Sequence, residues 1–217
     1  MKLIIGNKNY SSWSLRGWLA LKAFNVPFEE VKLSLISKSF YTELAKHSPA
    51  GKVPVLVDGD LNVWDSLSIC EYINEEYLQG KGWPEDKNKR AVARSIVADM
   101  HSGLFGIRGE MPMNCRAKRH LELSEKALKE IQTLDGIWSR LRTENASNGA
   151  YLFGEFSLAD VFFAPVIFRF TTYKVAVSDT AQAYMANMLA HPSMQEWLED
   201  ALAETEIIDA DEAGEDI

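Results

Sequence analysis

Short apolar runs and amphipathic stretches alternate through the first part of the chain. Alternating polarity indicates a strand, whereas apolar residues spaced three and four apart indicate a helix. The pattern predicts a strand at 3–5, a helix at 13–24, a strand at 31–35, a short helix at 40–46, a hairpin at 53–57 and 61–64, and a helix at 66–78. This order, βαβαββα, predicts a compact α/β domain over residues 1–79.

Glycine and proline interrupt this pattern at residues 80–86, and the periodicity that follows is almost entirely helical. The clearest predicted helices span 87–109, 116–142 and 158–173, with shorter ones at 180–189 and 193–202. We therefore expect a linker at 80–86 and an all-helical domain at 87–217.

Pro54 lies inside a run that otherwise resembles the start of a buried strand. Proline cannot donate to a sheet, so its position indicates a strand edge, a bulge or a cis peptide bond. A cis Val53-Pro54 bond would turn the Val53 peptide outward, where it could pair with an extended peptide ligand. Downstream, Asp65-Ser66 opens an apolar helix that we expect to bury Leu67, Cys70, Ile73 and Tyr77. A helix N-terminus binds anions, and Asp65 beside it can hold an ammonium group, so this segment predicts a site for a small zwitterionic peptide.

Serines cluster in Tyr10-Ser11-Ser12-Trp13-Ser14, where the first strand leads into the first helix. One of these serines can cap the helix. Another possibility is a hydroxyl that donates to a bound thiolate, because such a donor and a helix N-terminus both stabilise the charged form of sulfur. Trp13 beside these serines could cover an apolar pocket.

Other reactive residue types have no context that indicates catalysis. Ser157-Leu158-Ala159-Asp160 has the spacing of a capping box, which explains Asp160 without a catalytic role. We expect the four histidines to be surface or capping residues, Cys70 to be buried and Cys115 to be more exposed; the histidines are His47, His101, His120 and His191. Gly103, Gly106 and Gly109 indicate either a fraying helix end or a close contact at a cleft wall or subunit interface.

The net charge of -8 comes from the C-terminus, because nine acidic residues and no basic ones follow position 198. The remaining residues hold 23 basic and 22 acidic side chains, which argues against a nucleic-acid partner. We expect the acidic tail to be a solubilising terminus. The two cysteines lack metal or disulfide spacing, so we predict no metal and a cytoplasmic protein. Neither a signal peptide nor a membrane span is predicted.

Three of these motifs together resemble the cytosolic glutathione transferases. The segment 10–16 is similar to the serine-type catalytic loop of the zeta, theta and delta classes, 50–56 to the cis-proline segment, and Asp65-Ser66 to the γ-glutamyl site. The Ser157–Asp160 cap is similar to a motif of the family's helical domain. The resemblance implies an α/β thioredoxin-like N-terminal domain, an all-α C-terminal domain and a homodimer.

Residue roles follow from the same resemblance. The backbone of Val53 would pair with the cysteinyl part of glutathione, with Lys52 and Pro54 in the same site. Asp65 and Ser66 would hold the γ-glutamyl end, and either Ser11 or Ser12 would bond the sulfur. The expected substrate pocket contains Trp13, His101 and Phe105.

The implied activity is conjugation of glutathione to a small hydrophobic electrophile. Trp13 stands where zeta members have a cysteine, which counts against maleylacetoacetate isomerase activity, and Asp65 is shorter than the Glu or Gln of many relatives. The alternatives are a glutathione-dependent isomerase, a glutathione-binding dimeric module with little turnover, and a thiol-disulfide oxidoreductase. The last is disfavoured because the chain has no CxxC motif.

Overall fold

Four short strands form a mixed sheet in the computed structural model, which describes residues 1–217. The strands are β1 (Lys2–Ile5), β2 (Glu29–Lys32), β3 (Val55–Asp58) and β4 (Leu61–Trp64), in the order β2-β1-β3-β4. β1 is parallel to β2, whereas the β1–β3 and β3–β4 pairs are antiparallel. The predicted order of elements is confirmed, although β2 ends before Leu33 and Leu35, which the sequence pattern had placed within it.

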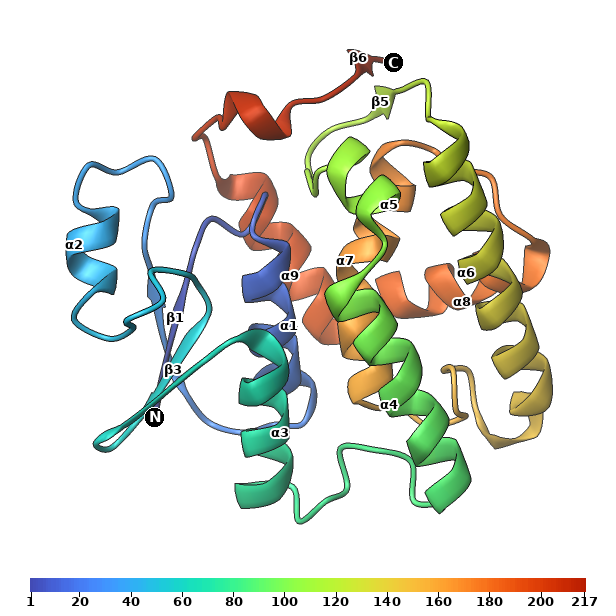
Figure 1. The fold of residues 1–217 in the computed structure, drawn as a ribbon, viewed down its shortest axis with the longest axis horizontal. Coiled ribbons are helices and arrows are strands. Elements are labelled where there is room, and N and C mark those ends of the chain that lie inside the picture. Colours follow the sequence, from blue (N-terminus) through green and yellow to red (C-terminus); the bar gives the residue numbers. More distant parts are fainter.

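Side chains alternate between the two faces of this sheet. Leu3, Ile5 and Leu56 belong to the main core, which includes residues of α1 (Ser12–Ala23) and α3 (Ser66–Glu76). Ile4 and Val55 instead join a small cluster with α2 (Phe40–Leu44) on the other side of the sheet (Figure 1). Two layers of helix therefore flank the sheet, and α1 connects it to the rest of the molecule.

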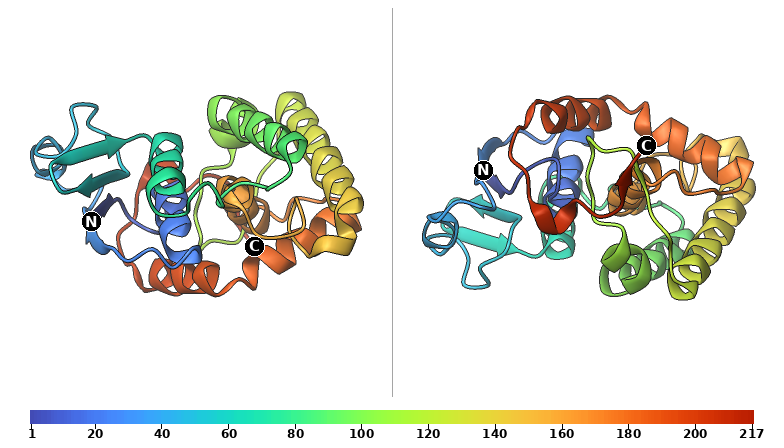
Figure 2. Two further views of the ribbon diagram at one scale, coloured as in Figure 1. Left: turned by 90° about the horizontal axis from the view of Figure 1, so that it is seen from below. Right: turned by 90° about the horizontal axis from the view of Figure 1, so that it is seen from above.

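Helices account for most of the remaining chain: α4 (Lys87–Ser102), α5 (Phe105–Glu110), α6 (Glu125–Glu144), α7 (Leu158–Thr172), α8 (Asp179–Leu189) and α9 (Pro192–Ala203). Figure 2 shows α7 end-on in the middle of this helical part. One core cluster of 45 buried residues includes side chains of both α1 and α7, so the sheet part and the helical part share one core. This arrangement confirms the predicted fold class. None of the helices combines the length and apolar character needed to cross a lipid bilayer.

The capping box at the start of α7 is confirmed. The Asp160 carboxylate accepts hydrogen bonds from the Ser157 N–H at 2.9 Å, the Leu152 N–H at 3.1 Å and the Tyr184 hydroxyl at 3.1 Å. Burial raises the pKa of this carboxyl to about 6, and these bonds oppose the shift. Asp160 therefore has a structural role.

Two of the predicted helices are wrong in extent. The helix predicted at 87–109 breaks after Ser102, because Gly103 ends α4 and Leu104 adopts a left-handed φ of 54°. The helix predicted from residue 116 begins at Glu125 instead, since Ser124 caps it. The residues before that cap include β5 (Arg119–His120), which pairs with β6 (Glu215–Asp216).

Some predicted exposures are also wrong. Tyr77 lies beyond the end of α3 and is 41% exposed, with its hydroxyl bonded to Asp58. Cys115 is buried rather than exposed, because its thiol lies against the carbonyl of Lys8. The three glycines of the series differ. A Cβ on Gly103, which ends α4, would lie 2.6 Å from the Asp99 carbonyl of that helix, and one on Gly106 would lie 2.9 Å from the Ala127 backbone of α6. Gly109 has no neighbour within 4 Å of such a Cβ.

The prediction that the acidic tail is a solubilising terminus is wrong. Figure 1 shows the chain after α9 running across the top of the molecule to β6. The Glu204 carboxylate accepts the N–H groups of Lys8 at 2.8 Å and Asn9 at 3.0 Å. Glu212 accepts a hydrogen bond from the Tyr10 hydroxyl at 2.5 Å. The tail is therefore an interaction element that holds the loop before Ser11.

Candidate functional site

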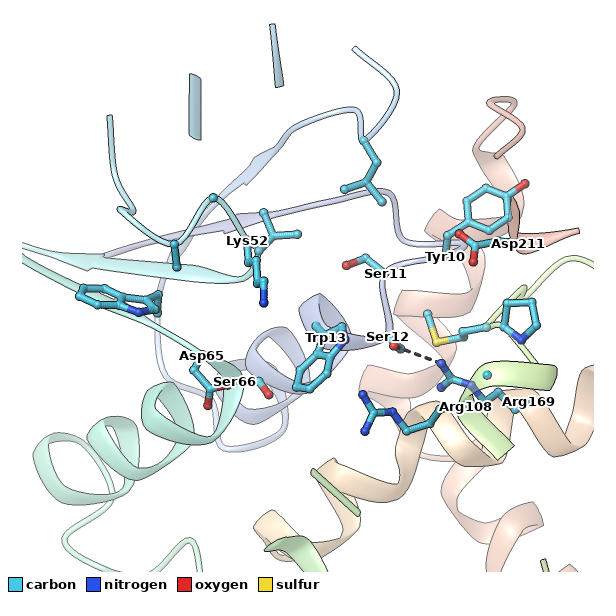
Figure 3. A pocket seen from close by; sticks show the side chains of 18 of the residues that line it. Tyr10, Ser11, Ser12, Trp13, Lys52, Asp65, Ser66, Arg108, Arg169 and Asp211 are labelled. Carbon is cyan, nitrogen blue, oxygen red and sulfur yellow. Dashed lines mark hydrogen bonds between the residues drawn. The ribbon is translucent and has the colours of Figure 1, made fainter. Parts of the chain in front are cut away.

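A cavity of about 870 Å³ lies between the sheet part and the helical part (Figure 3). The sheet part contributes Leu35, Phe40 and residues from the segments 10–13, 50–53 and 64–66 to its lining. The helical part contributes Phe105, Arg108, Gly109, Pro112, Met113 and Arg169, and the tail contributes Asp211. The predicted residues Ser11, Ser12, Trp13, Lys52, Val53, Asp65, Ser66 and Phe105 are thus brought together around one cavity.

The serine loop (residues 10–13) lines this cavity and leads into the first turn of α1. Ser11 is the N-cap, and its Oγ accepts the N–H of Ser14 at 3.4 Å and donates to the Ser14 Oγ at 2.7 Å. Ser12 is the first helical residue, and its Oγ accepts a hydrogen bond from Arg169 at 3.3 Å. In Figure 3 the Ser11 hydroxyl points towards the side of Lys52, whereas the Ser12 hydroxyl faces Arg169. The two hydroxyls therefore face different sides of the cavity.

The wall next to Ser11 presents backbone groups. The Val53-Pro54 peptide is cis, as predicted. Val53 lines the cavity, and neither its N–H nor its C=O forms a backbone hydrogen bond within the chain. Pro54 itself does not line the cavity but packs against α1, where a Cβ on Gly17 would lie 3.3 Å from its ring. The free Val53 peptide can pair with an extended ligand.

The N-terminus of α3 lines the cavity next to this wall. Asp65 has a φ of 75° and caps α3 by accepting the N–H groups of Leu67 and Ser68. Its other carboxylate oxygen lies 3.2 Å from Nε2 of His101. Burial raises the pKa of Asp65, but the His101 hydrogen bond and the cap bonds outweigh it and lower the pKa overall. The Ser66 hydroxyl is fully buried and has no partner in the chain.

The predicted substrate pocket is partly corrected. Trp13 and Phe105 line the cavity, and the Phe105 side chain is 64% exposed. His101 does not line it, because its ring lies behind Trp13 at a centroid distance of 5.2 Å and bonds to Asp65. His101 therefore supports Asp65, although the sequence had shown no partner for it.

Arg108, Arg169 and Asp211 line the cavity but were not expected there. Arg108 stacks on Trp13 with its guanidinium carbon 5.0 Å from the ring centroid. Arg169 is 5% exposed, and its Nε donates to the Met111 carbonyl at 2.7 Å. Arg169 is the only basic residue of the mostly apolar α7 sequence, and this was the available signal, since a charged residue is costly to bury without a partner.

Two family models match the chain. Residues 10–76 match the glutathione S-transferase N-terminal domain, and residues 116–200 match the glutathione S-transferase C-terminal domain. The chain belongs to the glutathione transferase family. It is thus an enzyme of a transferase family that uses glutathione, as the motifs predicted.

Curated members of the glutathione transferase family are similar to this chain over most of their own length. Glutathione S-transferase Z1 of Arabidopsis thaliana is 33% identical over 173 residues, which are 74% of this chain and 75% of that protein. A probable maleylacetoacetate isomerase of Caenorhabditis elegans is 28% identical over 195 residues, which are 85% of this chain and 89% of that protein.

A solved structure confirms the transferase fold. A glutathione transferase homologue from Burkholderia with bound glutathione superposes with a TM-score of 0.71 at 23% identity, covering 92% of this chain and 97% of that one.

Proposed function

We propose that this transferase binds glutathione along the wall formed by Val53, Asp65 and Ser66. The Ser11 hydroxyl stabilises the thiolate, and the sulfur then attacks a small electrophile held by Trp13 and Phe105. The Val53 peptide pairs with the cysteinyl backbone of glutathione, and Lys52 lies at the same wall.

The buried Ser66 hydroxyl is the observation that carries this proposal. Buried polar groups nearly always have a partner, so a fully buried hydroxyl without one, beside a ligand-sized cavity, favours a ligand partner. Ser66 is also the first residue of α3, where free N–H groups and the helix dipole favour a carboxylate. The adjacent Asp65 carboxylate, whose pKa is lowered, can hold an ammonium group. Carboxylate and ammonium together match the γ-glutamyl end of glutathione.

The orientation of the two hydroxyls favours Ser11 as the thiolate donor. The Ser12 hydroxyl faces Arg169, away from the Val53 wall, whereas the Ser11 hydroxyl points towards it. Ser11 can turn its O–H from Ser14 to the sulfur while still accepting the Ser14 N–H. The N-terminus of α1 adds a positive potential that further stabilises the thiolate.

The test compares Ser11→Ala with Ser12→Ala in glutathione-dependent turnover and in the pH dependence of thiolate absorbance. We expect Ser11→Ala to lower kcat about tenfold to a hundredfold and to raise the pKa of the bound thiol, because one charge-assisted bond contributes about 1.5–3 kcal/mol. Ser11→Thr keeps the hydroxyl and should restore most of the activity. Equal turnover in the wild type, both single variants and the double variant would disprove a serine mechanism.

Glutathione-dependent isomerisation is a second candidate, since a similar protein of Caenorhabditis elegans is named a probable maleylacetoacetate isomerase and one of Rattus norvegicus a maleylacetoacetate isomerase. An isomerase regenerates glutathione, whereas a conjugating enzyme consumes it. Proton NMR of maleylacetone with a trace of glutathione distinguishes the two reactions. Trp13 at the cysteine position of the zeta class favours conjugation.

We also infer a homodimer and a cytoplasmic location, where thiols are kept reduced. Apolar side chains on β4 and α4 are exposed in the single chain: Leu61 is 47%, Trp64 43% and Val92 37% exposed. Sedimentation velocity should show a dimer, and Trp64→Glu should shift it towards the monomer. A glutathione-binding dimer without turnover is the remaining alternative, and calorimetry with no detectable conjugation would support it.

A further inference from the structure

His101, near the end of α4, joins the helical part to the α3 end of the cavity. Its Nε2 lies 3.2 Å from a carboxylate oxygen of Asp65, and its side chain is 21% exposed. Figure 3 shows Asp65 and Ser66 on one side of Trp13 and Ser12 on the other, and the His101 ring meets Trp13 edge-on. A residue outside the cavity lining therefore holds a carboxylate that lines it.

Three elements fix the position of His101. Its ring lies 5.2 Å from Trp13 of α1 and 6.1 Å from Phe162 of α7, measured between ring centroids. Its backbone carbonyl accepts a hydrogen bond from Arg108 of α5 at 3.1 Å. A side chain packed in this way can hold a neighbouring group in one orientation.

Arg16 of α1 determines which nitrogen of His101 carries the proton. Its Nη1 lies 3.5 Å from Nδ1 of His101, and a guanidinium can only donate. Nδ1 is therefore the acceptor, so in the neutral ring Nε2 carries the hydrogen and donates it to Asp65. Arg16 is 1% exposed, and its buried charge beside Nδ1 opposes a second proton on the ring.

The Asp65 carboxylate keeps one acceptor position for a ligand. Its Oδ1 accepts the N–H groups of Leu67 at 2.8 Å and Ser68 at 3.3 Å, and its Oδ2 accepts Nε2 of His101. An ionised carboxylate has about four lone-pair positions, so one remains, at Oδ2. The Asp65 side chain is 39% exposed and lines the cavity, which makes this position accessible to a ligand.

We propose that His101 is a positioning residue: held by Arg16, it orients the Asp65 carboxylate so that the remaining lone pair of Oδ2 binds an ammonium group of the ligand. The inference rests on the proposed function, because it names what sets the affinity at the same site. Without the His101 bond, Oδ2 loses its only partner in the chain and the terminal side-chain torsion is less restricted. His101 itself touches neither the ammonium nor the sulfur in this proposal.

The test measures binding of glutathione and of its deaminated analogue, glutaryl-cysteinylglycine, by calorimetry. The two ligands differ only in the ammonium group, so the ratio of their affinities reports the contact with Asp65. We expect the wild type to bind glutathione at least about tenfold more tightly than the analogue, because a hydrogen bond between charged groups is a strong one.

His101→Asn and His101→Gln form a matched pair of variants. The Gln amide nitrogen reaches the position of Nε2 and can still donate to Asp65, whereas the Asn amide reaches only the position of Nδ1. We expect His101→Asn to lower the affinity ratio about fivefold to tenfold by weakening glutathione alone, and His101→Gln to keep most of the ratio. His120→Asn, at an exposed histidine of β5, is the control.

Two further measurements separate positioning from a general structural effect. The KM for glutathione should rise in His101→Asn while kcat at saturating glutathione stays within about twofold, because Ser11 holds the sulfur at the other end of the ligand. Nitrogen-15 NMR of the wild-type imidazole should show the proton on Nε2 of His101. A neutral ring with its proton on Nδ1 would overturn the proposal, and a melting curve of each variant shows whether it is folded.

The two ligands also separate this inference from the function on which it rests. If the wild type prefers glutathione but His101→Asn weakens both ligands equally, or neither, the positioning role is wrong and the proposed function stands. If the wild type binds both ligands equally, Asp65 holds no ammonium, and this inference fails together with that contact. If glutathione does not bind at all, both proposals are wrong.

Discussion

The two ends of the cavity are built in different ways. The end that we propose for glutathione comes from one continuous segment, in which the Val53 peptide and the α3 N-terminus are 12 residues apart in sequence. The arginine end combines Arg108 of α5, Arg169 of α7 and Asp211 of the tail. At the first end each group is positioned by local backbone geometry, whereas at the second each depends on packing between distant elements.

This difference decides how each end responds to mutation. Ser66 has an unpartnered hydroxyl, so the fold does not depend on it. Arg169 bridges Met111, Pro165 and Ser12, so the fold and the site both depend on it. A ligand contact such as Ser66, in the continuous segment, can therefore be changed at little cost in stability. A contact such as Arg169, which joins distant elements, cannot be changed without destabilising the fold.

Arg169→Ala tests the contrast most strongly. We expect a loss of about 3 kcal/mol in the free energy of unfolding, because the buried carbonyl of Met111 loses its donor and a large cavity remains. Urea denaturation measures the change, with Arg140→Ala as the exposed control. A loss below about 1 kcal/mol would mean that the arginine end is no more integrated into the fold than the end that we propose for glutathione.

Glu204→Ala tests whether the tail holds the loop before Ser11 in place. Two backbone N–H groups, of Lys8 and Asn9, would lose their acceptor, so we expect a loss of about 2 kcal/mol and lower turnover. Glu199, exposed on α9 and without an ion pair, provides the control Glu199→Ala. Thermal unfolding and conjugation rates measure both effects. An unchanged rate in Glu204→Ala would show that the loop holds its position without the tail.

Ser66→Ala should change binding without changing stability. Its hydroxyl has no partner in the chain, so we expect the free energy of unfolding to stay within about 0.5 kcal/mol. Glutathione should bind about tenfold more weakly in calorimetry, because one hydrogen bond to a charged group is lost. Ser68→Ala, on the exposed side of the same helix, is the matched control. A purely structural Ser66 would give the reverse pattern.

The same contrast explains what the sequence could predict. Hydrophobic periodicity and turn residues located the sheet elements, the cis Val53-Pro54 bond and the α3 N-cap at Asp65, because each depends on neighbouring residues. The break at Leu104, the strand at Arg119 and the burial of Cys115 depend on contacts with residues far away in sequence. The acidic tail was misinterpreted for this reason, since the backbone N–H groups that bind Glu204 lie at Lys8 and Asn9.

Asp211→Asn gives the smallest expected effect and tests how charge at the arginine end contributes to stability. Burial raises the pKa of Asp211, with Arg169 opposing and Glu212 adding to the shift. The protonated form is therefore favoured in the folded protein, so Asp211 contributes most to stability below its ordinary pKa and less as pH rises through the raised value. Hydrogen bonds from Tyr10 and Arg119 lower the pKa of Glu212 despite its burial, so Glu212 stays charged over this range.

Acidification from pH 7 towards pH 5 should accordingly stabilise the wild type relative to Asp211→Asn by under about 1 kcal/mol, because the asparagine side chain cannot take up the proton. Urea denaturation of the two proteins at several pH values measures this difference. Asp209→Asn, on the same turn but exposed, is the control measured in the same series. If the stability difference between the wild type and Asp211→Asn does not change with pH, the charge of Asp211 does not affect the arginine end, and the two ends of the cavity differ only in how they fold.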